Sequence, residues 1–390
     1  MLLALLTALG LTFGLHYYFW IRLVRDTALP QPYRGVATLA LWMLGLSLPA
    51  TMIFGRLSPA FGRLLAWPGF IWMGTMMLLF LTLLGSEVLR LGLSAVGLAH
   101  AATGAMSDPE RRLFLSRCLA GLAGVATSGL GLVALRAGLR DVALREVEIK
   151  LRRLPAALSG LTIVQLSDVH VGPTIGRRFI ETLVARVNGL DPDLIAITGD
   201  LVDGSVAELA HAVAPLGDLK ARLGVFFVTG NHEYYSGVDD WLAELRRLGI
   251  RVLRNERVTV GDGEASIDLA GIDDFMSRGQ APGHGPDLPR ALDGRDPSRE
   301  LILLAHQPKA FGEALRHGVG LQLSGHTHGG QIWPWGYAVK LQQGGWVAGL
   351  YRRGDHQLYV NEGTGYWGPP MRLASQGEVT RLVLRRDPAA

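Results

Sequence analysis

Histidine, aspartate and asparagine, the residue types that bind divalent metal ions, recur in short motifs through the second half of the chain. The last motif, LSGHTHGGQI, places two histidines only two residues apart. The candidate ligands in chain order are Asp168, His170, Asp200, Asn231, His306, His326 and His328. Carboxylate and amide oxygens mixed with imidazoles suit ions such as Mn²⁺, Fe²⁺ or Zn²⁺. One carboxylate shared by two such ligand groups would create a two-metal site, which activates water and holds phosphoryl oxygens. The pattern predicts metal-assisted hydrolysis of a phosphate ester.

Each motif follows a short apolar run that is typical of a buried β-strand. The runs LTIVQLS, DLIAITG, GVFFVTG and LILLA are rich in apolar and β-branched residues and stop at polar residues or glycine. Helical patterns between them, such as DDWLAELRRLG, suit the crossovers of a parallel sheet. Ligands of open α/β sheets bind beyond the carboxyl ends of the strands. We therefore expect the separate motifs to meet at one edge of an α/β fold.

Five glycines stand inside or beside these motifs. Gly199, Gly230 and Gly325 each precede a candidate ligand, where glycine permits a tight turn or a close backbone approach. Gly329 and Gly330 would let backbone amides approach a bound phosphate. An ordinary loop role is the alternative for any single one of them.

In this order, Asp-x-His, Gly-Asp-x-x-Asp, Gly-Asn-His-Glu, an isolated His and Gly-His-x-His resemble the motifs of the calcineurin-like metallophosphoesterase superfamily. The resemblance covers roughly residues 161–384. It implies a four-layer αββα sandwich and two divalent ions. One ion would be held by Asp168, His170, Asp200 and His328. The other would share Asp200 and add Asn231, His306 and His326.

The same resemblance implies roles for residues that are not ligands. His232 would face the substrate and stabilise the phosphoryl group or protonate the leaving oxygen. Asp203 would orient a ligand, and Glu233 would do likewise. The remaining histidines of this half have no partner ligands nearby in sequence and are assigned no site role: His211, His284, His317 and His356.

Long apolar runs are concentrated in residues 1–140. Four of them reach the roughly 20 residues that cross a bilayer as a helix. The predicted spans are about 2–21, 36–55, 69–94 and 118–137. One cleaved signal peptide is the alternative, but it leaves the second and third runs unexplained. Glu87 and Arg90, near the end of the third run, are spaced to pair with each other.

The expected division is therefore a helical membrane region at residues 1–140, a linker with the first strand at 141–160, and a catalytic domain at 161–385. Counting the arginines of the loops does not decide the orientation. Arg111 and Arg112 resemble a twin-arginine export motif, and a plain basic cytoplasmic loop is the alternative. Both interpretations place this loop inside the cell. We expect a multi-pass protein of the cytoplasmic (inner) membrane with its catalytic domain outside the cytoplasm.

The composition indicates which classes of molecule the chain could bind. A formal net charge of +4 is modest, and the basic residues cluster beside the apolar runs. This distribution argues against nucleic-acid binding and suits acidic lipid headgroups. Cys118 is the single cysteine, so an intrachain disulfide is excluded.

Several features of the last third of the chain leave alternatives open. Trp333, Trp335 and Trp367 either form an apolar rim over the site or pack in a core. The region 274–299, rich in Gly, Pro and Asp, is either a lid or a solvated loop. The runs GGWVAGLYRRG, HQLYVNEGTG and EVTRLVLRR predict strands of a second sheet.

GHTHGGQI, the segment GYWGPPMR and the apolar region together resemble a narrower group, the bacterial transmembrane proteins with a metallophosphoesterase domain. This resemblance implies a membrane-anchored phosphodiesterase acting on a lipid- or envelope-associated phosphate ester. A UDP-diacylglucosamine-type pyrophosphatase of lipid A synthesis is one alternative, and a non-catalytic membrane scaffold or sensor is another. The full set of ligand types argues against the scaffold.

Overall fold

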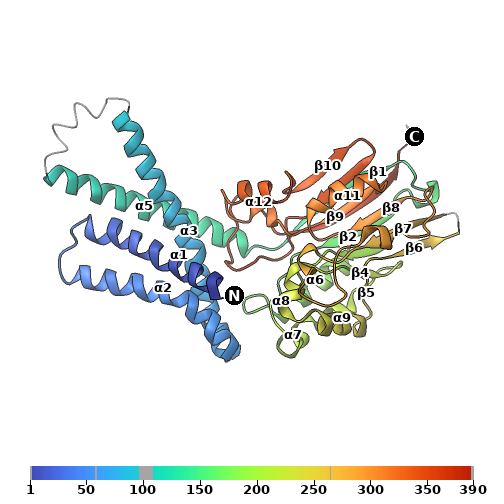
Figure 1. Cartoon of the computed structure of the whole chain (residues 1–390), viewed down its shortest axis with the longest axis horizontal. Helices are drawn as coiled ribbons and strands as arrows, with labels where there is room; N and C mark the ends of the chain where they lie inside the picture. Colours follow the sequence, from blue (N-terminus) through green and yellow to red (C-terminus); the bar gives the residue numbers. More distant parts are fainter. Residues whose placement is uncertain (1, 58, 96–108, 264, 388–390) are drawn as a thin grey trace. The chain divides into compact units, whose positions relative to one another are not determined.

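The computed structural model describes residues 2–57, 59–95, 109–263 and 265–387 (Figure 1). The chain divides into two compact units. One comprises Met1–Ala137 with Gly368–Met371, and the other comprises Gly138–Trp367 with Arg372–Ala390.

The first unit is helical. Its elements are α1 (Leu2–Trp20), the π-helical turn η1 (Ile21–Arg25), α2 (Tyr33–Leu57), α3 (Pro59–Ala95) and α5 (Pro109–Gly138), which ends at the unit boundary. Each of the four predicted spans therefore lies in a helix. Within the described residues, only Phe61–Leu89 and Arg112–Gly138 are long and apolar enough to cross a membrane. The described residues thus contain two candidate spans, which include most of the third predicted span and all of the fourth, and four spans are not supported.

Two polar contacts join helices inside the helical unit. Nη2 of Arg22 lies 2.9 Å from Oε1 of Glu87. The sequence predicted Arg90 as the partner of Glu87, and the structure shows that the turn after α1 brings Arg22 to this carboxylate. The side chain of Arg90 lies outside the described residues. His16 is fully buried, and its Nε2 accepts a hydrogen bond from Nε1 of Trp72 at 2.9 Å.

The second unit contains two six-stranded sheets in the part of the chain that the structure describes. The first sheet has the order β1 (Ala143–Leu151), β12 (Glu378–Arg386), β2 (Thr162–Leu166), β3 (Leu194–Ile197), β4 (Val225–Phe227) and β5 (Arg251–Val252). The second has the order β10 (Gly349–Arg353), β11 (His356–Val360), β9 (Leu321–Ser324), β8 (Leu301–Leu304), β7 (Ala265–Gly271) and β6 (Glu256–Asp262). Strands β2 to β5 are parallel, as are β7, β8, β9 and β11.

The helices of this unit are short. They are α6 (Arg177–Asn188), α7 (Val206–Val213), α8 (Asn231–Ser236), α9 (Val238–Arg247), α10 (Leu288–Ala291), α11 (Phe311–Arg316) and α12 (Gly336–Gln342). Single 3₁₀ turns lie at η2 (Ala156–Leu158), η3 (Ala214–Asp218), η4 (Phe275–Ser277), η5 (Pro308–Ala310) and η6 (His328–Gly330). The region 274–299 is therefore not all loop, because η4 and α10 lie within it.

Buried side chains arrange these elements in four layers. On β2, Val164 packs toward α6 and α9, whereas Ile163 points to the opposite face, as the two-residue period of a strand requires. Ile163 belongs to a cluster that joins both sheets and includes Ile302 of β8. A third cluster packs α10 and α11 on the outer face of the second sheet, through residues such as Phe311. Burying each such side chain contributes about 1.5–3 kcal/mol. The predicted αββα sandwich is confirmed at this level.

The strands predicted before the motifs form as expected, but one later strand does not. EVTRLVLRR becomes β12, which lies in the first sheet and not in the second. It pairs with β2 in antiparallel register, Thr380 opposite Gln165, and with β1 in parallel register. Leu382 and Leu384 of this strand point into the cluster between the sheets. The apolar alternation predicts a strand here, but it carries no information about which sheet receives it.

Candidate metal centre

The candidate ligands lie in the loops that follow strands. Asp168 and Asp200 come after β2 and β3, which are parallel neighbours, so both lie at the same edge of the first sheet. Asn231 is the first residue of α8, after β4. His306 follows β8 and His326 follows β9, which are parallel neighbours in the second sheet. Strand ends of both sheets therefore supply one site.

The backbone of this site is unusual. Five non-glycine residues have left-handed φ angles: Asp168 (52°), His170 (54°), Asp200 (52°), His326 (71°) and His328 (50°). Such conformations cost on the order of 1–3 kcal/mol each and cluster at functional sites. The packed sheets thus hold strained loops where these side chains converge.

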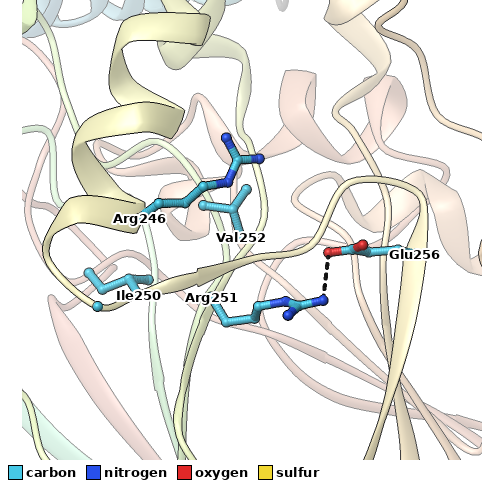
Figure 2. A pocket seen from close by; sticks show the side chains of 6 residues that line it. Arg246, Ile250, Arg251, Val252 and Glu256 are labelled. Carbon is cyan, nitrogen blue, oxygen red and sulfur yellow. Dashed lines mark ion pairs between the residues drawn. The ribbon is translucent and has the colours of Figure 1, made fainter.

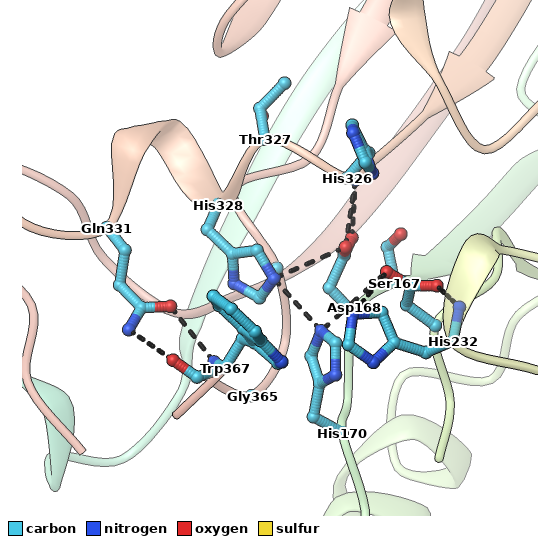
Figure 3. A network of polar contacts seen from close by, with 12 residues as sticks. Ser167, Asp168, His170, His232, His326, Thr327, His328, Gln331, Gly365 and Trp367 are labelled. Carbon is cyan, nitrogen blue, oxygen red and sulfur yellow. Dashed lines mark hydrogen bonds and ion pairs between the residues drawn. The ribbon is translucent and has the colours of Figure 1, made fainter. Parts of the chain in front are cut away.

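One group consists of Asp168, His170 and His328, all buried. One nitrogen or oxygen atom from each lies within 4.8 Å of those of the other two. Nε2 of His170 is 3.1 Å from Nε2 of His328, which in turn is 3.5 Å from Oδ1 of Asp168. Figure 3 shows these side chains pointing toward one another.

A second group consists of Asp200, His306 and His326, which satisfy the same distance limit. Nε2 of His306 lies 3.1 Å from Oδ2 of Asp200 and 3.2 Å from Nδ1 of His326. Oδ1 of Asn231 is 3.3 Å from the same Nε2. All seven predicted ligands are therefore brought together.

The spacing of these atoms fits two adjacent cations. Ligand atoms about 2.0–2.2 Å from one ion stand roughly 3.0–3.5 Å apart in octahedral or tetrahedral geometry. The distances of 3.1 Å between His170 and His328, and of 3.2 Å between His306 and His326, fall in this range. Oδ2 of Asp200 is also 3.9 Å from Nε2 of His170, so this carboxylate stands between the groups. Imidazoles and carboxylates together suit Mn²⁺, Fe²⁺ or Zn²⁺.

Asp203 orients two histidines at once. Its Oδ1 is 3.0 Å from Nδ1 of His170 and 2.6 Å from Nδ1 of His232. With Nδ1 occupied, each ring presents Nε2 to the site. Nε2 of His232 lies 4.0 Å from Oδ2 of Asp200, whereas that of His306 lies 3.1 Å from it. In the same way, Nδ1 of His306 donates to the carbonyl oxygen of Thr198 at 2.7 Å.

Glu233 ties the loops after β3 and β4 together. Its buried carboxylate accepts hydrogen bonds from the backbone amides of Asp200, Leu201 and Gly230 at 3.1, 2.8 and 2.6 Å. Burial, and then the charge of Asp200, raise the pKa of Glu233 to about 7. This residue acts on the site through the backbone that carries Asp200.

The surroundings shift the pKa values of the site histidines in different directions. Burial, and then His170, lower the pKa of His328 well below its usual value. Burial, and then His306, lower the pKa of His326 to about 3. Burial disfavours the imidazolium of His232, but Asp200 and Asp203 outweigh it and raise its pKa to about 9. His326 and His328 are thus held neutral, the form that binds metal, whereas His232 is held protonated.

A Cβ would meet an atom closer than 3.0 Å at all five predicted glycines, and at two of them that contact involves a candidate carboxylate ligand. A Cβ on Gly325 would lie 2.1 Å from Oδ2 of Asp168 and 1.9 Å from Oγ of Ser167. A Cβ on Gly230 would lie 2.2 Å from Oδ1 of Asp200. Any side chain at either position would push a carboxylate out of the cluster.

Arg372 is a residue whose role the sequence did not reveal. It is 1% exposed and donates hydrogen bonds to the backbone carbonyls of His328, Glu362, Gly363 and Gly365. Its guanidinium therefore fixes the loop of His328 from behind. The motif Gly-Tyr-Trp-Gly-Pro-Pro-x-Arg contains it, but spacing alone does not tell a buried anchor from a surface arginine.

Two aromatic rings stand beside His232. The ring of Tyr235 lies 5.3 Å from it and that of Trp367 lies 5.8 Å from it, both in edge-on geometry. Tyr235 is 57% exposed and Trp367 is 52% exposed. Figure 3 shows Trp367 beside the histidine cluster. The sequence proposed Trp367 as a rim residue and missed Tyr235, although Tyr235 is only three residues from His232.

The other histidines of this unit that make described contacts serve the scaffold. His284 lies 3.2 Å from the hydroxyl of Tyr234, and Nδ1 of His356 donates to the carbonyl of Val319 at 2.6 Å. A separate depression of about 490 Å³ lies beside β5. It is lined by Arg246, Gly249, Ile250, Arg251, Val252 and Glu256, and Arg251 pairs with Glu256 inside it (Figure 2). None of the predicted ligands lines this depression.

Comparison with known proteins agrees with this geometry. Residues 161–330 match the family described as calcineurin-like phosphoesterase. Proteins named "Transmembrane protein with metallophosphoesterase domain" from Danio rerio and Bos taurus are 46% and 44% identical to this chain. These alignments cover 62% and 72% of this chain, and 57% and 65% of the two relatives. The chain thus spans less than two thirds of their length.

Bacterial relatives carry a less specific name. The "Uncharacterized metallophosphoesterase YkuE" of Bacillus subtilis is 32% identical over 72% of this chain and 99% of its own length. The two relatives that carry the transmembrane name are animal proteins, whereas the bacterial relative is named only as a metallophosphoesterase. The predicted resemblance to a transmembrane group is therefore not limited to bacteria. Because that bacterial relative aligns over almost its whole length, this chain belongs to the calcineurin-like metallophosphoesterase family.

Proposed function

We propose that this chain is a membrane-anchored hydrolase of phosphate esters that uses two divalent ions. One ion would be held by Asp168, His170 and His328 together with Asp200. The second would be held by Asp200 with Asn231, His306 and His326. The observation that carries this proposal is the position of the Asp200 carboxylate, 3.1 Å from His306 and 3.9 Å from His170.

Two such ions, when bound, supply an activated water and neutralise charge on the phosphoryl oxygens. The chain supplies the rest. Asp203 holds the rings of His170 and His232 at fixed angles through Nδ1. Burial disfavours the imidazolium of His232, but Asp200 and Asp203 outweigh burial and raise its pKa to about 9. His232 would donate from Nε2 to the phosphoryl group or to the leaving oxygen.

The proposed substrate is a phosphodiester carried by a lipid or by an envelope component. Support comes from the two apolar helices and from the transmembrane name of the animal relatives. A pyrophosphate linked to a lipid is the second substrate to test, because the same two-ion chemistry would cleave it. Manganese, iron and zinc are the ions to compare.

The activity test uses the purified full chain, metal-loaded, with a chromogenic phosphodiester. We expect turnover with Mn²⁺ and its loss in Asp200→Asn, which removes the charge shared by both groups. The matched control is Asp239→Asn, an exposed aspartate on α9. Equal activity of wild type and Asp200→Asn would reject catalysis at this centre and favour a scaffold or sensor.

For location, the proposal is a multi-pass protein of the cytoplasmic membrane with an extracytoplasmic catalytic domain at residues 161–385. The basic pair Arg111-Arg112 before the last apolar run supports this orientation. A pair of reporters fused after residue 390 tests it, one active only in the cytoplasm and one only outside. Signal from the cytoplasmic reporter alone would overturn the proposed orientation.

A further inference from the structure

Five large apolar side chains form an exposed group that we call the aromatic patch. They are Trp333 (55% exposed), Trp335 (60%), Tyr337 (68%), Leu341 (87%) and Trp367 (52%). Scattered exposed apolar residues are ordinary on protein surfaces, but a contiguous group indicates a contact surface. The core role that the sequence left open for the tryptophans is therefore wrong, since none of them is buried.

The members of the patch are linked to one another. Four of them lie within nine residues of the chain. Trp333 and Trp335 come just before α12, and Tyr337 and Leu341 lie on it. Gln331 joins Trp367 to this segment, because its Nε2 donates to the carbonyl of Trp367 at 2.9 Å and its Oε1 accepts from the amide of Trp367 at 3.0 Å. Figure 3 shows this pair of bonds. The patch is thus a single structural feature.

The exposed rings stand on a packed base. The amide of Trp333 donates to the carbonyl of Leu373 at 2.9 Å, and Ile332, between Gln331 and Trp333, is buried. Gly330 approaches α12 so closely that a Cβ there would lie 2.4 Å from the Cα of Gly336. The exposure of the patch is therefore a property of the fold and not of a frayed loop.

The patch borders the metal centre. The segment of Trp333 and Trp335 directly follows η6, whose first residue is the ligand candidate His328. The ring of Trp367 lies 5.8 Å from that of His232. A molecule bound to the aromatic patch would therefore lie next to His232 and the candidate metal ligands.

Two observations favour a lipid surface as the occupant. Tryptophan and tyrosine have an apolar body and a polar tip, and they are enriched at the interface of a bilayer. At such an interface the side chain of Leu341 would lie among the lipid chains, and the ammonium of Lys340 would contact a lipid headgroup. The chain also limits the distance to the bilayer. Only residues 139–142 separate α5 from β1, and four residues reach about 14 Å at most. A candidate span, Arg112–Gly138, forms nearly all of α5.

We propose that the aromatic patch inserts into the headgroup region of the bilayer and so holds the metal centre at the lipid surface. A phosphate ester carried by a lipid would then reach His232 without leaving the membrane. This inference rests on the proposed membrane anchoring, but it does not depend on the proposed hydrolysis.

The test measures depth in the full chain, reconstituted in nanodiscs of neutral and anionic phospholipid. The single cysteine is removed by Cys118→Ser, and a nitroxide is attached at Leu341→Cys. The control is Ser298→Cys, exposed and before β8, at the sheet edge opposite His306. We expect the label at 341 to collide mainly with oxygen, which is soluble in lipid, and the label at 298 mainly with a water-soluble nickel complex.

Equal collision with the nickel complex at both positions would overturn the proposal. So would a label at 341 that is shielded from both reagents, because a protein surface would then cover the patch. A second measurement uses Tyr337→Ser/Leu341→Ser, two exposed members of the patch on α12. We expect its turnover to fall by about tenfold on a phosphodiester in vesicles and to stay unchanged on a soluble one. An equal loss on both substrates would contradict docking, whereas an inactive wild type would reject only the proposed function.

Discussion

At the scale of single residues, His232 differs from the ligand candidate His306 in its distance from Asp200. Its Nε2 is 4.0 Å from Asp200, whereas that of His306 is 3.1 Å away. We predict that His232→Ala keeps its bound metal but loses about 10²- to 10⁴-fold in turnover, the usual contribution of a positioned acid. Metal analysis and kcat on a chromogenic diester check this, with exposed His211→Ala as control. Metal lost together with turnover would reassign His232 as a ligand.

His306 predicts how metal binding depends on pH. Burial disfavours its imidazolium, but Asp200 and Asp168 outweigh burial and raise its pKa well above 6.5. Without metal, this imidazole is therefore protonated at neutral pH, and an incoming ion must displace the proton. Apparent affinity for Mn²⁺ should rise with pH below that raised pKa, by up to about tenfold per unit for one proton. Calorimetry in two buffers of different ionisation enthalpy measures the proton released; release of none would refute the assignment.

At the scale of elements, the turn between β9 and His326 is the most sensitive part of the site. A Cβ on Gly325 would collide with Ser167 and Asp168, both fully buried. We predict that Gly325→Ala lowers metal affinity by at least about tenfold, because Asp168 must move.

The matched control for that prediction is Gly312→Ala in α11, where a Cβ meets nothing within 4 Å. Because no atom would be displaced, this variant should bind metal normally. Alanine is the better helix former by about 1 kcal/mol, so its Tm should be slightly higher. Titration of both purified variants with Mn²⁺ decides the matter. Unchanged affinity in Gly325→Ala would show that the turn relaxes without displacing the carboxylate.

At the scale of the whole molecule, metal and fold should stabilise each other. Asp168 and Asp200 are both buried. Bound cations would neutralise the negative charges of these two carboxylates. An ion at 100 times its Kd adds about 2.7 kcal/mol. For a unit of this size that corresponds to roughly 5–10 °C in Tm.

Thermal unfolding with excess Mn²⁺ and with a chelator measures this difference. Asp200→Asn should show a much smaller shift, since it weakens both ion sites. A Tm that does not change on metal removal would mean that the loops hold their geometry unaided.

Much of the site was predictable because strand ends have a local signature. The apolar runs before Asp168, Asp200 and His306 become β2, β3 and β8, and parallel strands bring their ends to one edge within each sheet. The close approach at Gly230 and Gly325 was predictable for the same reason, as crowded turns need glycine. The meeting of the edges of two sheets at one site was not predicted. The helices of the first unit followed from apolar length, although among the described residues only two meet the criterion for a span.

The sequence by itself thus determined the ligand types, the strands that carry them and the membership of the family, because these depend on residue order over short distances. Only the tertiary structure decided that β12 enters the first sheet, that Arg22 pairs with Glu87, that Asp203 holds two histidines and that the aromatic patch faces outward. Each of these joins segments far apart in the chain, or depends on which face of a segment is covered. Such pairings are set by the packing of whole layers, and no local pattern encodes them.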